Sequence, residues 1–220
     1  MWNRSEDRRT RRGRPGSGAT SRTRLLVAGA GVVFVLLGAV ACNKLVQASR
    51  SSTILVIERI GAARGGTSDD PIQTLLNSDV VTNGGVFPDI ARVTTRLALK
   101  APGTSESPTS PTSANWVTIT GYRVVYRRTD GRATAGVDVP YPFEGGMTMT
   151  TLDIGTAEFT LVRAQAKLEQ PLLALRQGGG AVALSVIGEI TFFGHDQTGA
   201  AVSADGTIGI NFADFSDPGA

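Results

Sequence analysis

Residues 25–41 form an uninterrupted apolar segment, LLVAGAGVVFVLLGAVA, which constrains the chain more than any other feature. The segment contains no charged or strongly polar side chain, so its transfer from water into hydrocarbon is favourable along its whole length. As an α-helix it would rise about 26 Å, slightly less than the roughly 30 Å core of a bilayer. Its glycines and alanines dilute its hydrophobicity further. These properties favour a transient export signal over a permanent transmembrane helix.

Basic residues are concentrated in front of this segment. Residues 1–24 contain eight arginines against two acidic residues, Glu6 and Asp7. Because positively charged flanks stay on the cytoplasmic side, this arrangement predicts that the chain after the segment is exported. We therefore expect residues 1–42 to act as a helical signal peptide or membrane anchor.

The apolar segment leads into the tetrapeptide AVAC at residues 39–42, which ends on Cys42, the only cysteine. Small residues before a cysteine at this place resemble the lipobox of bacterial lipoproteins, and the resemblance covers residues 22–42. It implies cleavage before Cys42 and a diacylglycerol on its sulfur. In a cell with two membranes, Asn43 after the cysteine implies sorting to the outer membrane. One departure is Ala39, where the lipobox usually carries leucine.

Two alternatives to lipidation stay open. In the first, the segment is an uncleaved signal anchor, and Cys42 is a small apolar residue at the membrane face. In the second, residues 39–41 form an ordinary A-x-A cleavage site, and the product is released in soluble form.

The charge of the chain divides at Cys42. The whole chain is formally +3, but 14 basic and 17 acidic residues follow Cys42, so the exported part is about −3. Nucleic-acid binding needs a surplus of Lys and Arg that this part lacks, so nucleic acid is not an expected partner. The 178 residues after Cys42 suffice for one core without disulfides. We expect a polar tether over residues 43–52 and one domain over residues 53–215.

Hydrophobic alternation after the tether predicts a series of β-strands. Residues 90–100 alternate most clearly, with Val93, Thr95, Leu97 and Leu99 on one face. The predicted strands cover residues 53–60, 75–82, 90–100, 116–128, 148–152, 157–167, 181–194 and 207–215.

The segments between these strands carry turn and loop signals. Residues 101–115 contain three prolines and are small or polar, which predicts a mobile loop. Residues 137–143, VDVPYPF, are expected to be extended at a sheet edge or in a loop. Proline near the start of residues 170–176 and glycine just after them predict one short helix. Residues 196–200 are expected to turn the last hairpin.

One predicted strand, residues 116–128, changes its alternation phase at Gly121. Apolar side chains occupy odd positions before this glycine and even positions after it. A β-bulge at Gly121 would keep both sets facing the core.

The strand pattern predicts an all-β fold, an antiparallel immunoglobulin-like β-sandwich of about seven to nine strands. A closed barrel is the alternative. The arrangement after Cys42, including the run FGHDQTGAAVSADGTIGINF at residues 193–212, resembles uncharacterised bacterial lipoproteins. This resemblance implies no activity.

The sequence offers few groups for catalysis or metal binding. His195 is the only histidine, which excludes a histidine-cluster zinc site. It is expected on the surface, pointing away from Asp196. Four acidic residues that lack the spacing of a calcium loop are expected to be solvated in or near loops: Asp69, Asp70, Asp79 and Asp89. We expect no catalytic residue, no metal and no cofactor.

Aromatic residues and arginines gather between residues 122 and 143. Exposed aromatics and arginines are typical of contact surfaces for sugars or proteins. The candidate contact residues are Tyr141, Phe143, Arg127 and Arg128. For Tyr122 and Tyr126, the favoured interpretation is burial in the core, with Arg123 and Arg127 on the solvent face.

Together these features predict a lipid-anchored, non-catalytic module of the cell envelope, in the periplasm or on the cell surface. Its partners would be the membrane and an envelope protein or glycan. One alternative is a carboxylate-based enzyme acting on glycans, which needs two carboxyl groups about 5–9.5 Å apart in one cleft. The other is a bitopic subunit of an inner-membrane assembly that keeps residues 25–41 as a helix.

Overall fold

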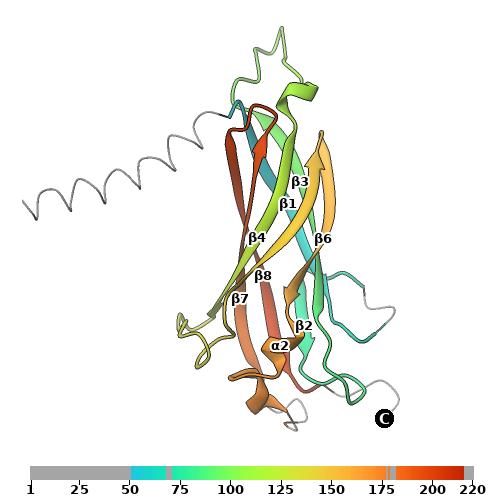
Figure 1. The fold of residues 1–220 in the computed structure, drawn as a ribbon, viewed down its shortest axis with the longest axis vertical. Coiled ribbons are helices and arrows are strands. Elements are labelled where there is room, and N and C mark those ends of the chain that lie inside the picture. The colour runs from blue at the N-terminus through green and yellow to red at the C-terminus, as the bar shows by residue number, and fades with distance from the viewer. Residues whose placement is uncertain (1–50, 68–70, 177, 179–181, 216–220) are drawn as a thin grey trace, which may run out of the picture. The chain divides into compact units, whose positions relative to one another are not determined.

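The computed structural model describes residues 51–67, 71–176, 178 and 182–215. They lie in a unit that spans Val46–Ala220 and consist of eight strands with very little helix, which confirms the all-β prediction (Figure 1). The predictions for residues 1–42 and most of the tether fall outside the described residues. The elements are β1 (Thr53–Ala63), β2 (Leu75–Asp79), β3 (Asp89–Leu99), η1 (Ser113–Asn115), β4 (Val117–Arg128), β5 (Phe143–Thr151), β6 (Ile154–Val162), α2 (Ala164–Lys167), η2 (Leu172–Leu175), β7 (Leu184–Asp196) and β8 (Ala201–Ala213).

The strands form two sheets that face each other across one core. The three-stranded sheet has the order β1-β3-β6, and the five-stranded sheet has the order β2-β8-β7-β4-β5. All neighbours are antiparallel except β2 and β8, which run parallel, so the expectation of a purely antiparallel fold is wrong at this edge. The chain pairs with β1 at Gln73, bends at Thr74 and then follows β8, which gives β2 its direction.

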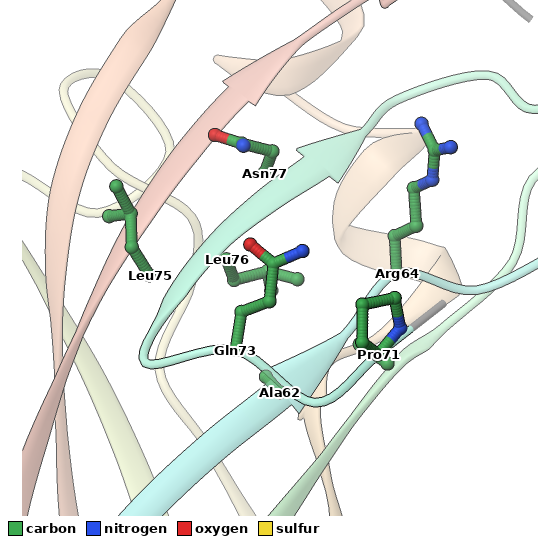
Figure 2. Close-up of a pocket in the computed structure, with 8 residues that line it drawn as sticks. Ala62, Arg64, Pro71, Gln73, Leu75, Leu76 and Asn77 are labelled. Atoms are coloured by element: carbon green, nitrogen blue, oxygen red, sulfur yellow. The ribbon is translucent and has the colours of Figure 1, made fainter. Parts of the chain in front are cut away.

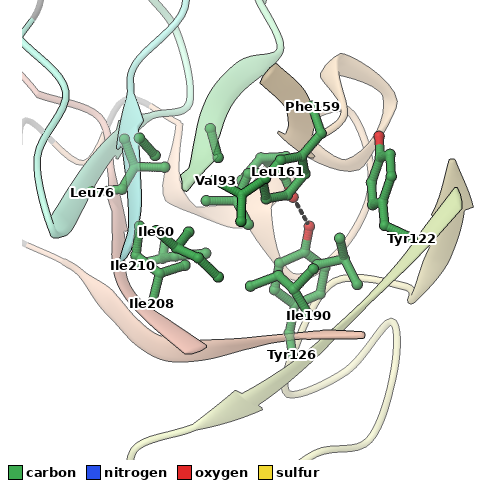
Figure 3. Close-up of a cluster of buried hydrophobic side chains, with 14 of the residues drawn as sticks. Ile60, Leu76, Val93, Tyr122, Tyr126, Phe159, Leu161, Ile190, Ile208 and Ile210 are labelled. Carbon is green, nitrogen blue, oxygen red and sulfur yellow. Dashed lines mark hydrogen bonds between the residues drawn. The ribbon is translucent and has the colours of Figure 1, made fainter. Parts of the chain in front are cut away.

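The core lies between the inward faces of both sheets (Figure 3). Its centre holds an aromatic cluster in which the ring of Phe159 lies 4.9 Å from that of Tyr122 and 5.2 Å from that of Phe192, both edge to face. Burial of such large rings is a major source of stability in a chain without disulfides.

The predicted β-bulge in β4 is present. The register of β4 shifts between Ile119 and Gly121 against both of its neighbours, β5 and β7. Side chains on both sides of the shift are buried, from Ile119 before it to Tyr122 and Tyr126 after it. The extra residue therefore keeps both apolar sets in the core, as the phase change in the sequence predicts.

Several predicted boundaries are wrong. The strand expected over residues 157–167 ends at Val162, and the chain then forms α2. Residues 134–139 make a turn, and extended pairing begins only at Phe143. The short helix expected over residues 170–176 is a 3₁₀ turn, Leu172–Leu175, and β8 begins six residues earlier than expected.

The strands give the sandwich two different ends. At one end, called the tether end, the chain enters β1: the Lys100 N–H donates to the Ser52 carbonyl oxygen at 3.0 Å, and Asn115 Nδ2 donates to Ser52 Oγ at 3.0 Å. At the opposite end, called the loop end, lie four of the seven connections between strands. Their described residues are 64–67 and 71–74, 80–88, 129–142, and 163–176 with 178 and 182–183. The expected loop over residues 101–115 lies at the tether end and includes η1.

Candidate functional site

A fully buried carboxylate organises the loop end. Asp89, the first residue of β3, is completely inaccessible to solvent. Its Oδ1 accepts hydrogen bonds from Lys167 Nζ at 2.8 Å and from the Gly65 N–H at 2.9 Å. Its Oδ2 accepts one from Ser78 Oγ at 2.5 Å. One side chain thus connects β3 to the β1–β2 connection, to β2 and to α2.

β6 ends at Val162, which pairs with Asp89, the first residue of its partner strand β3. The chain then forms α2, which turns Lys167 into the interior, where its side chain is 1% exposed. A buried ammonium group is tolerated only when it is paired and hydrogen-bonded. The Lys167–Asp89 pair meets that condition.

A second buried carboxylate, Asp79, fixes the end of the five-stranded sheet. Its Oδ2 accepts a hydrogen bond from Thr82 Oγ1 at 3.2 Å, and its Oδ1 accepts one from the Phe215 N–H at 3.1 Å. The prediction that Asp79 and Asp89 are solvated loop carboxylates is therefore wrong, because both stabilise the fold from inside. Asp69 and Asp70 fall outside the described residues.

Among the residues that the structure describes, several buried donors at the loop end have no hydrogen-bond acceptor. They include Nε of Arg163, Nε and Nη2 of Arg176, and the hydroxyl of Thr67. The Arg163 guanidinium carbon lies 4.8 Å from the centre of the Phe143 ring, an arrangement that favours a cation over an aromatic face. Unpaired buried donors are costly, so these groups set the loop end apart from the rest of the described core.

A hollow of about 210 Å³ opens at the same end, where β1 and β2 separate (Figure 2). The side chains of Arg64, Gln73 and Asn77 give it a polar rim, and Pro71 and Leu76 give it an apolar wall. Its size suits a short side chain or a small polar group rather than a drug-sized ligand.

The two aromatic candidate contact residues, Tyr141 and Phe143, differ in exposure. Tyr141 is 49% exposed and lies against Gly136, which has a positive φ of 75°. Phe143 is half-buried, with its ring edge to face against Tyr122 at 6.2 Å and beneath Arg163.

The two candidate arginines are engaged in surface ion pairs. Arg127 Nη2 lies 2.7 Å from Glu189 on the outer face of the five-stranded sheet. Arg128 Nε lies 3.3 Å from Asp130 in the following turn. Tyr122 and Tyr126 are buried while Arg123 and Arg127 are exposed, so the favoured interpretation of this stretch is confirmed.

His195 is exposed on the outer face of β7, and Asp196 is buried, as alternation predicts. Asp196 Oδ1 accepts from the N–H groups of Thr198 and Ala200, which fixes the β7–β8 turn. Burial acts to raise the pKa of Asp196, but the donors around it outweigh this effect, and the net result is a lowered pKa.

The described residues contain no group of three or more His, Cys, Asp or Glu side chains arranged to hold a metal ion. Within the same ranges, no helix has the length and hydrophobicity needed to cross a membrane.

Comparisons with known proteins give no assignment. No family model matches the chain, and no curated protein matches it. The function must therefore be argued from the chemistry of the chain.

Sequence reasoning missed the Asp89 cluster. The three partners of Asp89 come from three segments that lie 11 to 78 positions away, and neither Lys167 nor Asp89 belongs to a recognisable motif. The stretch that contains Lys167, residues 157–167, also carries Glu158 and Arg163, so its charges gave no signal that pointed to Lys167 alone.

Proposed function

We propose that the protein is a lipid-anchored, non-catalytic module of the cell envelope that binds another envelope component at its loop end. The observation that carries this proposal is the separation of the two ends. The chain enters β1 at one end, while the hollow and the unpaired buried donors lie at the other. A tether attached to the first end leaves the second free to meet a partner.

We also propose an immunoglobulin-like topology. The order β1-β3-β6 corresponds to strands A, B and E of that fold, and β8-β7-β4-β5 corresponds to G, F, C and C′. The short β2 beside β8 then extends the second sheet. In place of the disulfide between sheets, this chain has the aromatic cluster and tyrosine hydrogen bonds.

The burial or ion pairing of five carboxylates supports the proposal that the protein is not catalytic. Asp79 and Asp89 are buried and hydrogen-bonded, and Glu58, Glu158 and Glu189 form ion pairs on outer sheet faces. A glycan hydrolase needs two carboxyl groups that face one cleft open to substrate.

Lipidation is tested by metabolic labelling with a fatty-acid probe. The wild-type chain should take up the probe and Cys42→Ala should not. Equal labelling of both would refute the lipid part of the proposal.

The binding end is tested in cells with a photoreactive amino acid placed at Leu75, which lines the hollow and is 48% exposed. The matched control carries it at Thr120, which is exposed on β4 towards the tether end. A discrete cross-linked product at Leu75 that is absent at Thr120 is expected. The same products at both positions, or none at Leu75, would count against the loop end as the binding site.

A further inference from the structure

The outer face of the three-stranded sheet carries an aliphatic patch at its tether end. Ile54 lies opposite Ala98, and in the next row Val56 and Ile154 flank Arg96. Ile54 is 46% exposed and Ile154 is 59% exposed. Leu152, in the turn that leads into β6, adds a further exposed side chain. Clustered aliphatic side chains on a solvent face indicate an interaction surface.

The same face is hollowed next to this patch. Arg59, Thr94 and Thr156 form one row across β1, β3 and β6, and Arg92 projects from the neighbouring row. With Ile72 from the β1–β2 connection they line a hollow of about 280 Å³. Arginine and hydroxyl donors around one space match the oxygens of a phosphate group.

The charged side chains on this face leave one arginine available. Glu158 Oε1 lies 2.6 Å from Arg92, and Glu58 Oε1 lies 2.7 Å from Arg96. Arg59 has no ion-pair partner among the residues that the structure describes. Three arginines against two glutamates give the face a net charge of +1.

The outer face of the five-stranded sheet has the opposite sign. Its charged side chains are Arg123, Arg127, Glu144, Glu189 and Asp205. Two arginines against three carboxylates give it a net charge of −1. An anionic surface would therefore attract the first face in preference to the second.

The place where the chain enters the domain indicates which partner contacts the outer face of the three-stranded sheet. Ile54 is the second residue of β1, so the aliphatic patch begins where the chain enters the fold. Ten tether residues, 43–52, span at most about 35 Å when fully extended. A domain anchored through Cys42 would therefore stay within one tether length of a lipid surface.

We propose that the outer face of β1-β3-β6 lies on an anionic phospholipid bilayer (Figure 1). The aliphatic patch enters the boundary between headgroups and acyl chains, and the hollow takes a lipid phosphate between Arg59 and Arg92. This orientation leaves the loop end directed along the membrane plane, towards other proteins of the same membrane. The proposal rests on the lipid-anchored function proposed above.

The test uses the full-length protein from membranes, reconstituted in phosphatidylcholine vesicles with phosphatidylglycerol. A single cysteine replaces Ile154 in one variant and Ser203 in its matched control. Both positions are exposed towards the tether end, on opposite outer faces. Each cysteine carries a fluorophore, and lipids with a quencher on the acyl chain report proximity. The protein without an added cysteine is the control for labelling at Cys42. It takes up the fluorophore only if the Cys42 thiol is unmodified.

We expect quenching at position 154 to exceed quenching at position 203 by at least threefold. The double variant Arg59→Gln with Arg92→Gln should reduce this difference. The corresponding change on the other face, Arg123→Gln with Arg127→Gln, should leave it unchanged. Equal quenching at both positions would overturn the proposal, as would stronger quenching at position 203. Labelling of the protein without an added cysteine would instead count against lipidation, which separates the two failures.

Discussion

The Tyr126 hydroxyl donates a 2.6 Å hydrogen bond to the carbonyl oxygen of Leu161, across the core from β4 to β6 (Figure 3). Two inward positions earlier on β4, the Tyr122 hydroxyl accepts a hydrogen bond from the Thr160 N–H at 3.2 Å. Two tyrosines of one sheet therefore bind backbone groups at the edge of the other. They join the sheets directionally and cover part of an edge strand, which would otherwise offer a template for pairing between chains.

Tyr126→Phe should lower the free energy of unfolding by about 1–3 kcal/mol, because the Leu161 carbonyl would remain buried without its donor. Urea denaturation measures the change. Tyr141→Phe is the matched control, since Tyr141 is half exposed. A loss as small as that of the control would show that the buried hydrogen bond contributes nothing.

Tyr126 should also make stability fall in alkaline solution. Burial raises the pKa of Tyr126 above its ordinary value, and the negative charge of Asp89 acts in the same direction. The folded protein then keeps a proton that the unfolded chain releases above about pH 10, so stability is full below that pH and falls above it. Urea midpoints measured from about pH 9 to pH 11 should fall less steeply for Tyr126→Phe. Identical slopes would contradict this origin.

Lys167→Met should cost about 3–5 kcal/mol of stability, because it leaves the Asp89 carboxylate buried without its cation. The double variant Lys167→Met with Asp89→Leu should recover part of the loss, since neither charge of this pair then remains in the interior. For comparison, Arg127→Met removes an exposed ion pair and should cost no more than about 1 kcal/mol. A double variant as unstable as the sum of its single changes would refute the coupling.

Gly194→Ala should destabilise the five-stranded sheet by about 1–3 kcal/mol. A Cβ at position 194 would overlap the Thr118 carbonyl oxygen on β4, and backbone cannot move aside without breaking the ladder. Gly146→Ala on β5 is the control, because nothing lies within 4 Å of a Cβ built there. Equal thermal midpoints for the two variants would rule out this close contact as the reason for glycine.

Local pattern predicted the strands and even the bulge at Gly121, because burial of alternate side chains is a local requirement that the sequence shows directly. It failed where distant residues decide the structure. β6 ends at Val162 opposite the start of β3, and α2 then brings Lys167 to Asp89, 78 positions away, a contact that no local pattern predicts.

The candidate site was the least predictable part. Tyr141 and Phe143 were chosen because aromatics are common in binding surfaces, yet Phe143 packs against Tyr122 and Arg163. The hollow beside Arg64 arises where β1 and β2 diverge, which depends on how the connection between them folds back. No periodicity in the sequence reports that divergence.

The mass of the intact protein extracted from membranes tests the central claim most directly. We predict a chain that begins at Cys42 and carries a diacylglycerol on its sulfur, with acylation of the new amino group as a further increment. A chain that retains residues 1–41, or one that begins at Cys42 without lipid, would contradict the lipid-anchored module.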